Sequence, residues 1–224
     1  MKAVTTPLAS RLPSLVESAK FDFHGDALGE MWDDFQARHT EPGTKCWGDE
    51  DVMKKHNLTD PFPETTKHIN NMIAEKEKAG NHSAKRNSAK GILYCELMGT
   101  PQTVAGVETS DVQYRFFEDR LYLINASIRR LQSGGFSNGV LAYDAIKEAY
   151  IGRYGKPLNT HPDVYQNGFG ATFKGETVRW IDPRRMYELV VIDGHQEWVA
   201  VQFCDMQTQA RQKKLASPSN PDDL

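Results

Sequence analysis

Apolar residues recur at helical spacing in two parts of the chain, which predicts a helix in each. The first helix would begin at Asp26, a residue that can cap a helix N-terminus. The second would run from Ser137 to about Tyr154, because Gly155 and Pro157 follow and end helices. The apolar residues that carry this spacing are Leu28, Met31, Trp32 and Phe35 in the first helix, and Val140, Tyr143, Ile146, Tyr150 and Tyr154 in the second.

A different pattern, in which apolar and polar residues alternate or apolar residues form short runs, predicts strands. Short turn sequences join several of these strands into hairpins. The strongest is Asp193-Gly194, a preferred hairpin turn, whereas Glu118-Asp119 is not a preferred pair. The expected strands are 21–23, 92–98, 112–116, 121–128, 170–173, 177–181, 186–192 and 197–203, with Lys174-Gly175 as the turn between the fifth and sixth.

This order of elements predicts an α+β fold, with an antiparallel sheet and helices packed on one face. The two halves of the chain look alike, since each has a helix followed by antiparallel strands. No repeat of individual residues accompanies that similarity.

The domain organisation follows from the same pattern. We expect a partly mobile N-terminal segment at 1–20, a single domain at 21–206, and a mobile tail at 207–224 that has no apolar periodicity. A charged insertion at about 41–90 interrupts the domain, with a helix beginning near Pro63. Residues 21–66 hold 11 acidic and 4 basic residues, and residues 67–90 hold 6 basic and 2 acidic, which is typical of an exposed segment.

The composition is that of a globular protein of 224 residues, with 39% hydrophobic residues and a formal net charge of −3. A chain-wide basic surface for nucleic acid is absent. No apolar run approaches the roughly 20 residues that span a bilayer, and the N-terminus does not read as a signal peptide. The protein is therefore expected in the cytoplasm, or in the periplasm or envelope if a signal was removed.

Three cysteines leave two alternatives open. A disulfide between Cys46 and Cys95 would close a 48-residue loop, which a chain-entropy model values at about 4 kcal/mol. Otherwise Cys46, Cys95 and Cys204 are three buried free thiols. Their spacing does not fit a zinc site, so no metal is expected.

Candidate chemistry is sparse. The seven histidines are scattered, and no catalytic or phosphate-binding motif is present, so no catalytic residue and no cofactor is predicted. Trp180 and Trp198, on the late strands, could form an exposed ligand face, although alternation also allows them to lie in the core. Arg184 and Arg185 could bind an anion, although an exposed turn explains them equally.

Several short motifs resemble those of small bacterial envelope domains. They are Phe23-x-Gly25-x-x-Leu28-Gly29 with Phe35, Val112-x-Tyr114-x-Phe116, Leu121-x-x-Ile124 and Tyr154-Gly155-Lys156-Pro157. The pattern is similar to the β-lactamase-inhibitor-like domains and the SmpA/OmlA outer-membrane assembly lipoproteins, over 21–40 and 91–204. The resemblance implies helices on an antiparallel sheet, binding to other proteins and no catalytic residues; it assigns no functional residue here.

The sequence thus favours a non-catalytic binding protein with a protein partner, located in the bacterial cell envelope if a signal was removed. Two alternatives stay open. One is a hydrolase-like enzyme that uses dispersed His and Asp/Glu residues, and the other is a structural protein of a phage or secretion system.

Overall fold

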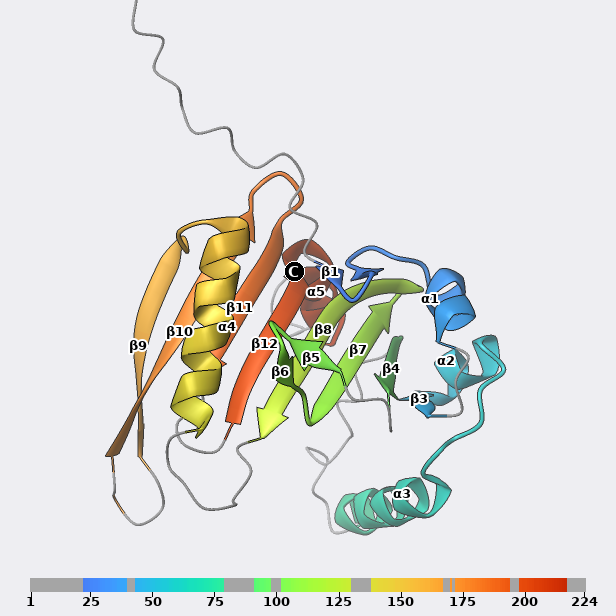
Figure 1. Cartoon of the computed structure of the whole chain (residues 1–224). Helices are drawn as coiled ribbons and strands as arrows, with labels where there is room; N and C mark the ends of the chain where they lie inside the picture. Colours follow the sequence, from blue (N-terminus) through green and yellow to red (C-terminus); the bar gives the residue numbers. More distant parts are fainter. Residues whose placement is uncertain are drawn as a thin grey trace, which may run out of the picture.

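One antiparallel sheet of eight strands, in the order β3-β4-β7-β8-β12-β11-β10-β9, forms the centre of the molecule (Figure 1). The computed structural model describes residues 22–39, 43–78, 91–97, 102–129, 138–166, 170, 172–193 and 198–216. The strands of the sheet are β3 (Thr44–Gly48), β4 (Ile92–Leu97), β7 (Asp111–Phe117), β8 (Arg120–Arg129), β9 (Asn159–Gln166), β10 (Thr172–Asp182), β11 (Tyr187–Asp193) and β12 (Trp198–Asp205). Two small hairpins, β1 (Asp22–Phe23) with β2 (Asp26–Ala27) and β5 (Thr103–Val104) with β6 (Val107–Glu108), lie outside it.

The sheet consists of two similar halves, as the sequence predicted. Helix α1 (Trp32–Arg38) precedes the sheet strands β3, β4, β7 and β8, and helix α4 (Asn138–Tyr154) precedes β9 to β12. Within each half every strand of this sheet pairs with the next one of the sheet along the chain, and the last strands, β8 and β12, pair with each other at the centre. The α+β class and the antiparallel sheet are confirmed.

Helices α1 and α4 both pack on one face of the sheet, which we call the inner face. The Phe35 ring of α1 lies 5.0 Å from Phe116 and 4.8 Å from Tyr114. The Tyr150 ring of α4 lies 6.1 Å from Trp180. These side chains belong to one buried cluster that extends over both halves. Burial of each large apolar side chain stabilises the fold by roughly 1.5–3 kcal/mol.

The first predicted helix begins later than expected. Asp26 is not its cap but lies in β2, and the helix begins at Trp32. Gly25 and Gly29 have φ values of +92° and +85°, a left-handed conformation that a right-handed helix cannot include. The spacing of the apolar residues did not reveal these two backbone reversals.

The Glu118-Asp119 turn between β7 and β8 is confirmed, although the pair is unusual there. Both residues have positive φ, 51° and 63°, as a type I′ hairpin turn requires. The predicted hairpin of β11 and β12 is also confirmed, while its Gly194 turn lies outside the described residues.

Two strand predictions were wrong. Lys174-Gly175 is not a turn, because β10 runs unbroken through it, with Gly175 opposite Asp163. Its partner β9 was not predicted at all. β9 is an edge strand with few apolar residues, and it contains Pro162, which normally counts against a strand except at an edge.

The insertion is shorter than the sequence suggested. Residues 44–48 form β3 and belong to the main sheet, so the inserted part consists of α2 (Glu50–Lys55), α3 (Pro63–Lys78) and their connections. The predicted helix beginning near Pro63 is confirmed as α3. The end of the insertion, at residues 79–90, lies outside the described residues.

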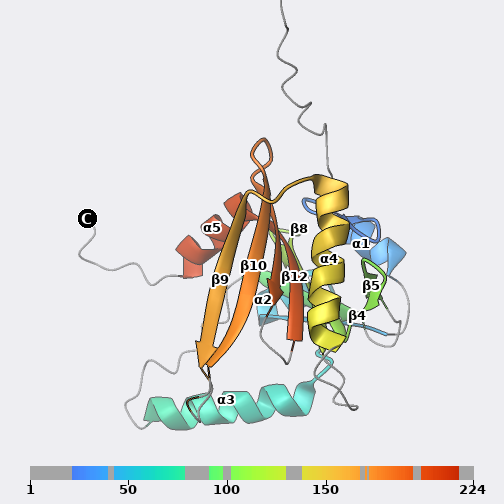
Figure 2. The same cartoon turned by 60° about the vertical axis from the view of Figure 1, so that its left-hand side comes forward.

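The prediction of a mobile tail from residue 207 was wrong for its first part, because Met206–Ala216 form helix α5. The Asp205 carboxylate caps this helix by accepting the N–H groups of Gln207 and Thr208. Helix α5 lies on the side of the sheet opposite α4 (Figure 2), where Arg211 stacks over Phe117. Its buried residues, Thr208 and Gln212, are polar, which explains why no apolar periodicity marked it. Residues 1–21 and 217–224 lie outside the described part.

Candidate functional site

Trp180, one of the predicted ligand-binding residues, lies in the core. It is 4% exposed, and its indole N–H donates to the backbone oxygen of Gly155 at 2.8 Å. It therefore anchors the end of α4 to the sheet and offers no surface to a ligand. Trp198 begins β12, but its side chain lies outside what the structure describes.

Arg184 and Arg185 are both exposed in the turn between β10 and β11. The Asp182 carboxylate accepts their two backbone N–H groups and so fixes the turn. The structure brings neither arginine together with Trp180, so the four predicted residues do not form one site.

Cys46 and Cys95 form a disulfide between directly opposed residues of β3 and β4. This outcome decides between the two alternatives that the sequence left open. Both cysteines lie on the inner face, within the buried cluster. The disulfide therefore ties the edge strand of the first half to the rest of the sheet.

The third cysteine is a poor nucleophile. Cys204 is buried and free, and burial, followed by the charges of Glu188 and Asp205, raises the pKa of its thiol to about 12. We expect iodoacetamide at mildly alkaline pH to alkylate Cys204 at least about 100-fold more slowly in the native than in the unfolded protein, since the thiolate is the reactive form. Mass spectrometry over time measures both rates; native alkylation within about tenfold of the unfolded rate would contradict this.

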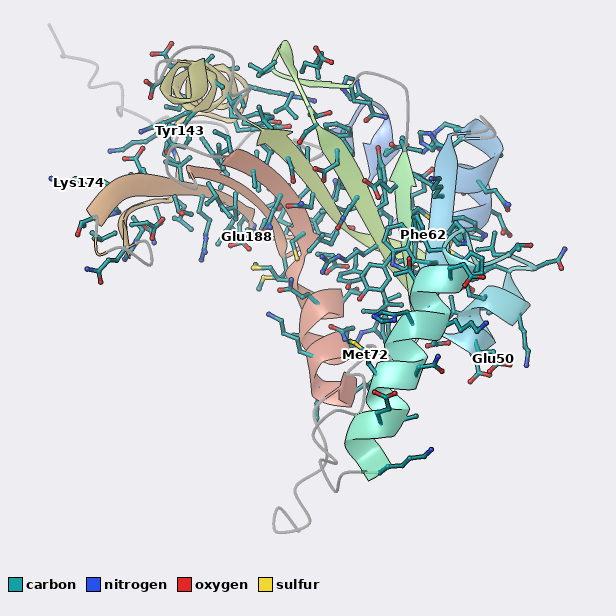
Figure 3. The ribbon with its side chains drawn as sticks, turned by 90° about the horizontal axis from the view of Figure 1, so that it is seen from below. Glu50, Phe62, Met72, Tyr143, Lys174 and Glu188 are labelled. Atoms are coloured by element: carbon teal, nitrogen blue, oxygen red, sulfur yellow. A yellow bond between two sulfur atoms is a disulfide. The ribbon has the colours of Figure 1, made fainter. Side chains whose placement is uncertain are left out.

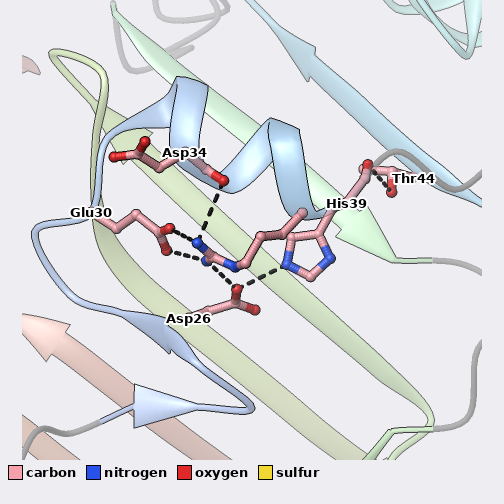
Figure 4. A network of polar contacts seen from close by, with 6 residues as sticks. Asp26, Glu30, Asp34, His39 and Thr44 are labelled. Carbon is pink, nitrogen blue, oxygen red and sulfur yellow. Dashed lines mark hydrogen bonds and ion pairs between the residues drawn. The ribbon is translucent and has the colours of Figure 1, made fainter.

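The one buried carboxylate of the described core is at the centre of an ion-pair network near the N-terminus (Figure 4). Asp26, 1% exposed, accepts hydrogen bonds from Arg38 at 2.7 Å and from the His39 ring at 2.8 Å. Glu30 pairs with the same guanidinium, and the two carboxylates raise the pKa of Arg38. A buried charge needs such partners. The network joins β2 to the end of α1 and fixes the position of His39.

The larger cavity, about 580 Å³, lies where α2 meets the turn between β7 and β8. An Asp–His pair, an arrangement that can act in catalysis, lines this cavity. His56 Nε2 is 3.0 Å from the Asp119 carboxylate. Lys55 also pairs with Asp119, and Asp49 accepts two backbone N–H groups, from Val52 and Gly91. No hydroxyl or thiol lines this cavity, so it contains an Asp–His pair without a hydroxyl or thiol nucleophile for the pair to activate.

The side of the sheet opposite the inner face, which we call the outer face, has a polar row across its strands and, beside it, a second buried cluster that includes Ile92, Leu123 and Cys204. One row of opposed residues crosses all eight strands, and seven of its eight residues are polar. None of the seven is buried. In order across the sheet, the row is Lys45, Glu96, Gln113, Asn125, Gln202, Val190, Arg179 and Asn159.

Several of these side chains interact across the strands. Gln202 donates to the Asn125 amide oxygen at 3.0 Å, and Arg179 pairs with Glu188 at 2.8 Å. Desolvation and the charge of Asp111 raise the pKa of Glu96. The outer face thus presents an ordered set of hydrogen-bond donors and acceptors.

Two helices project on the side of the outer face and border it. Figure 3 shows α5 and α3 on this side of the sheet and α4 on the other. The start of α3 is attached to the face by Phe62, whose ring lies 5.7 Å from Trp47. Farther along α3, Met72 is 42% exposed. Two helices therefore lie on the side of the outer face, and α3 carries an exposed apolar side chain.

Sequence reasoning missed the outer-face row because its members come from eight separate strands. Alternation showed that Gln113 and Asn125 lie opposite to the core, but the register that aligns them with Gln202 and Arg179 depends on the pairing of β8 with β12. No sequence signal specified that pairing.

Among the described residues, no group of three His, Cys, Asp or Glu side chains is placed to hold a metal ion, and no helix is long and apolar enough to cross a membrane. Comparisons of the chain with protein-family models, curated proteins and solved structures found no significant match.

Proposed function

We propose that this protein is a non-catalytic binding module whose outer face recognises another protein. The observation that supports this proposal is the polar row across all eight strands, from Lys45 to Asn159. Polar residues are expected on the solvated face of an antiparallel sheet, and the further feature that favours recognition is the hydrogen bond by which Gln202 and Asn125 order each other at its centre.

The chemistry of the row suits a protein surface. Asn125 and Gln202 offer both donors and acceptors, and a charged residue lies toward either edge, Glu96 in the first half and Arg179 in the second. Protein interfaces use about one hydrogen bond per 100–200 Å² around an apolar centre. Val190 and Ala200 on this face are buried, so the accessible part of the centre is formed by the amide side chains.

The cavities support a binding function better than a catalytic one. The Asp119–His56 pair lies in a cavity whose lining has no hydroxyl or thiol for it to activate, and its carboxylate is already shared with Lys55. The Cys46–Cys95 disulfide further supports a place in an oxidising compartment such as the bacterial cell envelope, because cytosolic reductants keep thiols reduced.

The proposal is tested by adding charge and bulk to the outer face. We expect Asn125→Arg with Gln202→Arg to weaken partner binding by at least about tenfold, because both amides would be replaced by like charges at the centre of the interface. Binding is measured with partners cross-linked to the wild-type protein in its host and then purified.

The matched control is Ala145→Arg with Ala149→Arg, which adds the same charge on the exposed side of α4. This variant should bind as the wild type does. Equal binding by both double variants would rule out the outer face as the interface, and circular dichroism would show whether each variant is folded.

A further inference from the structure

The strand β3 leaves backbone groups unpaired at the edge of the sheet. It is the terminal strand, paired only with β4. The Cα atoms of Cys46 and Cys95 are 4.1 Å apart, the short spacing of a non-hydrogen-bonded pair. In such pairs the N–H and C=O groups point away from the neighbouring strand, so those of Thr44 and Cys46 point outward. Within the described residues, no other backbone group bonds them.

A cavity of about 410 Å³ lies directly beside this edge. Thr44, Lys45 and Cys46 form one wall of it. Trp32, Phe35 and Gln36 of α1 form a second wall with His39, which follows the helix, and Leu58, Thr59 and Pro61, after α2, contribute to a third. These two walls are mixed, with apolar rings and aliphatic side chains beside the polar Gln36, His39 and Thr59, and the remaining side is a strand edge with free donors and acceptors.

The opposite edge of the sheet is different. β9 contains Pro162, which lacks an N–H group and obstructs the approach of another strand. β3 contains no proline. The two edges thus differ in their ability to pair, and a cavity lies beside the edge at β3.

We propose that the β3 edge and its cavity bind an extended segment of a partner protein, which adds a ninth strand to the sheet. The segment's backbone pairs with the outward groups of Thr44 and Cys46, and one apolar side chain enters the cavity between α1 and Leu58. Strand addition of this kind takes its affinity from main-chain hydrogen bonds and its specificity from side-chain pockets. The site shares only Lys45 with the outer-face row, and its other residues lie elsewhere, so either site can fail without the other.

The first test uses the free protein. Amide hydrogen exchange followed by NMR should show rapid exchange at Thr44 and Cys46, and slow exchange at Lys45 and Trp47, whose N–H groups point toward β4. Slow exchange at Thr44 and Cys46 would overturn the proposal, because their donors would already be paired.

The second test uses peptides of about 12 residues, selected on the wild-type protein from a phage-displayed library and then synthesised. We expect them to slow exchange at Thr44 and Cys46, and to bind Thr44→Pro at least about tenfold more weakly, because proline removes an outward donor. The matched variant Thr44→Val keeps that N–H and should bind within about twofold of the wild type.

A retained Cys46–Cys95 disulfide and a native circular dichroism spectrum would show that Thr44→Pro is folded. The proposal is overturned if no peptide is selected, if the peptides bind Thr44→Pro as tightly as the wild type, or if binding leaves exchange at Thr44 and Cys46 unchanged. Peptides whose binding is weakened only by the outer-face variant would assign peptide recognition to that face instead.

Discussion

Replacing both bridged cysteines, by Cys46→Ala with Cys95→Ala, is expected to lower the free energy of unfolding by about 4 kcal/mol. The disulfide joins residues 49 apart in the sequence, and closing a loop of that length restricts the unfolded chain to this extent in a chain-entropy model. The loss is large compared with the 5–15 kcal/mol of total stability typical of a domain. Urea unfolding followed by tryptophan fluorescence measures it.

The control for the loss of buried sulfur is Cys204→Ala. Cys204 is also buried but closes no loop, so its replacement should cost only about 1 kcal/mol. The wild-type protein in reductant should unfold at the same urea concentration as the double variant. A double variant no less stable than Cys204→Ala would show that the disulfide adds nothing to the stability of the fold.

The elements that the sequence predicted well are those whose ends carry their own chemical signals. Helix α4 ends at Tyr154, followed by Gly155 with a φ of +79°, the conformation expected of a residue that ends a helix. The β7–β8 hairpin was recognisable because one side of each strand is apolar and buried. In both cases the information lies within a few neighbouring residues.

The elements that the sequence missed are stabilised by contacts with distant segments. The buried residues of helix α5, Thr208 and Gln212, are polar, and the helix contacts both β12, which directly precedes it, and β8, which ends at Arg129 far earlier in the chain. Strand β3 has only five residues, and its place in the sheet depends on Cys46 meeting Cys95. Such pairings cannot be inferred from local spacing, because each position is decided by a partner elsewhere in the chain.

The candidate sites also divide into those that the local sequence suggested and those that depend on distant contacts. The disulfide was one of two alternatives that composition allowed, whereas the outer-face row needed the register of all eight strands. Asp26 shows a further difficulty, because its position before apolar residues suggested a helix cap. In the structure, two glycines turn the chain and bury its carboxylate beside Arg38. An aspartate can serve either as a helix cap or as a buried ion-pair partner, and only its tertiary contacts show which role it has.

Truncating Trp180 to alanine is expected to cost about 3–5 kcal/mol in the free energy of unfolding, as for a fully packed aromatic side chain. The ring is 4% exposed, lies against Tyr150 of α4, and belongs to the cluster that joins α4 to the sheet. Trp180→Phe keeps most of the apolar contact but removes the indole N–H that bonds Gly155. Loss of that hydrogen bond should cost about 1–2 kcal/mol, with urea unfolding followed by far-ultraviolet circular dichroism as the measurement.

The two variants together separate a core role for Trp180 from a role in ligand binding. If Trp180 acts only in the core, its substitutions lower stability in proportion to the side-chain volume that they remove. The free energy of unfolding of Trp180→Phe should then fall between those of the wild type and Trp180→Ala. Its partner binding, measured where the variant is folded, should match that of the wild type, because the side chain does not reach the surface. Unchanged stability in Trp180→Ala with weakened binding would contradict this and would return Trp180 to an exposed aromatic face.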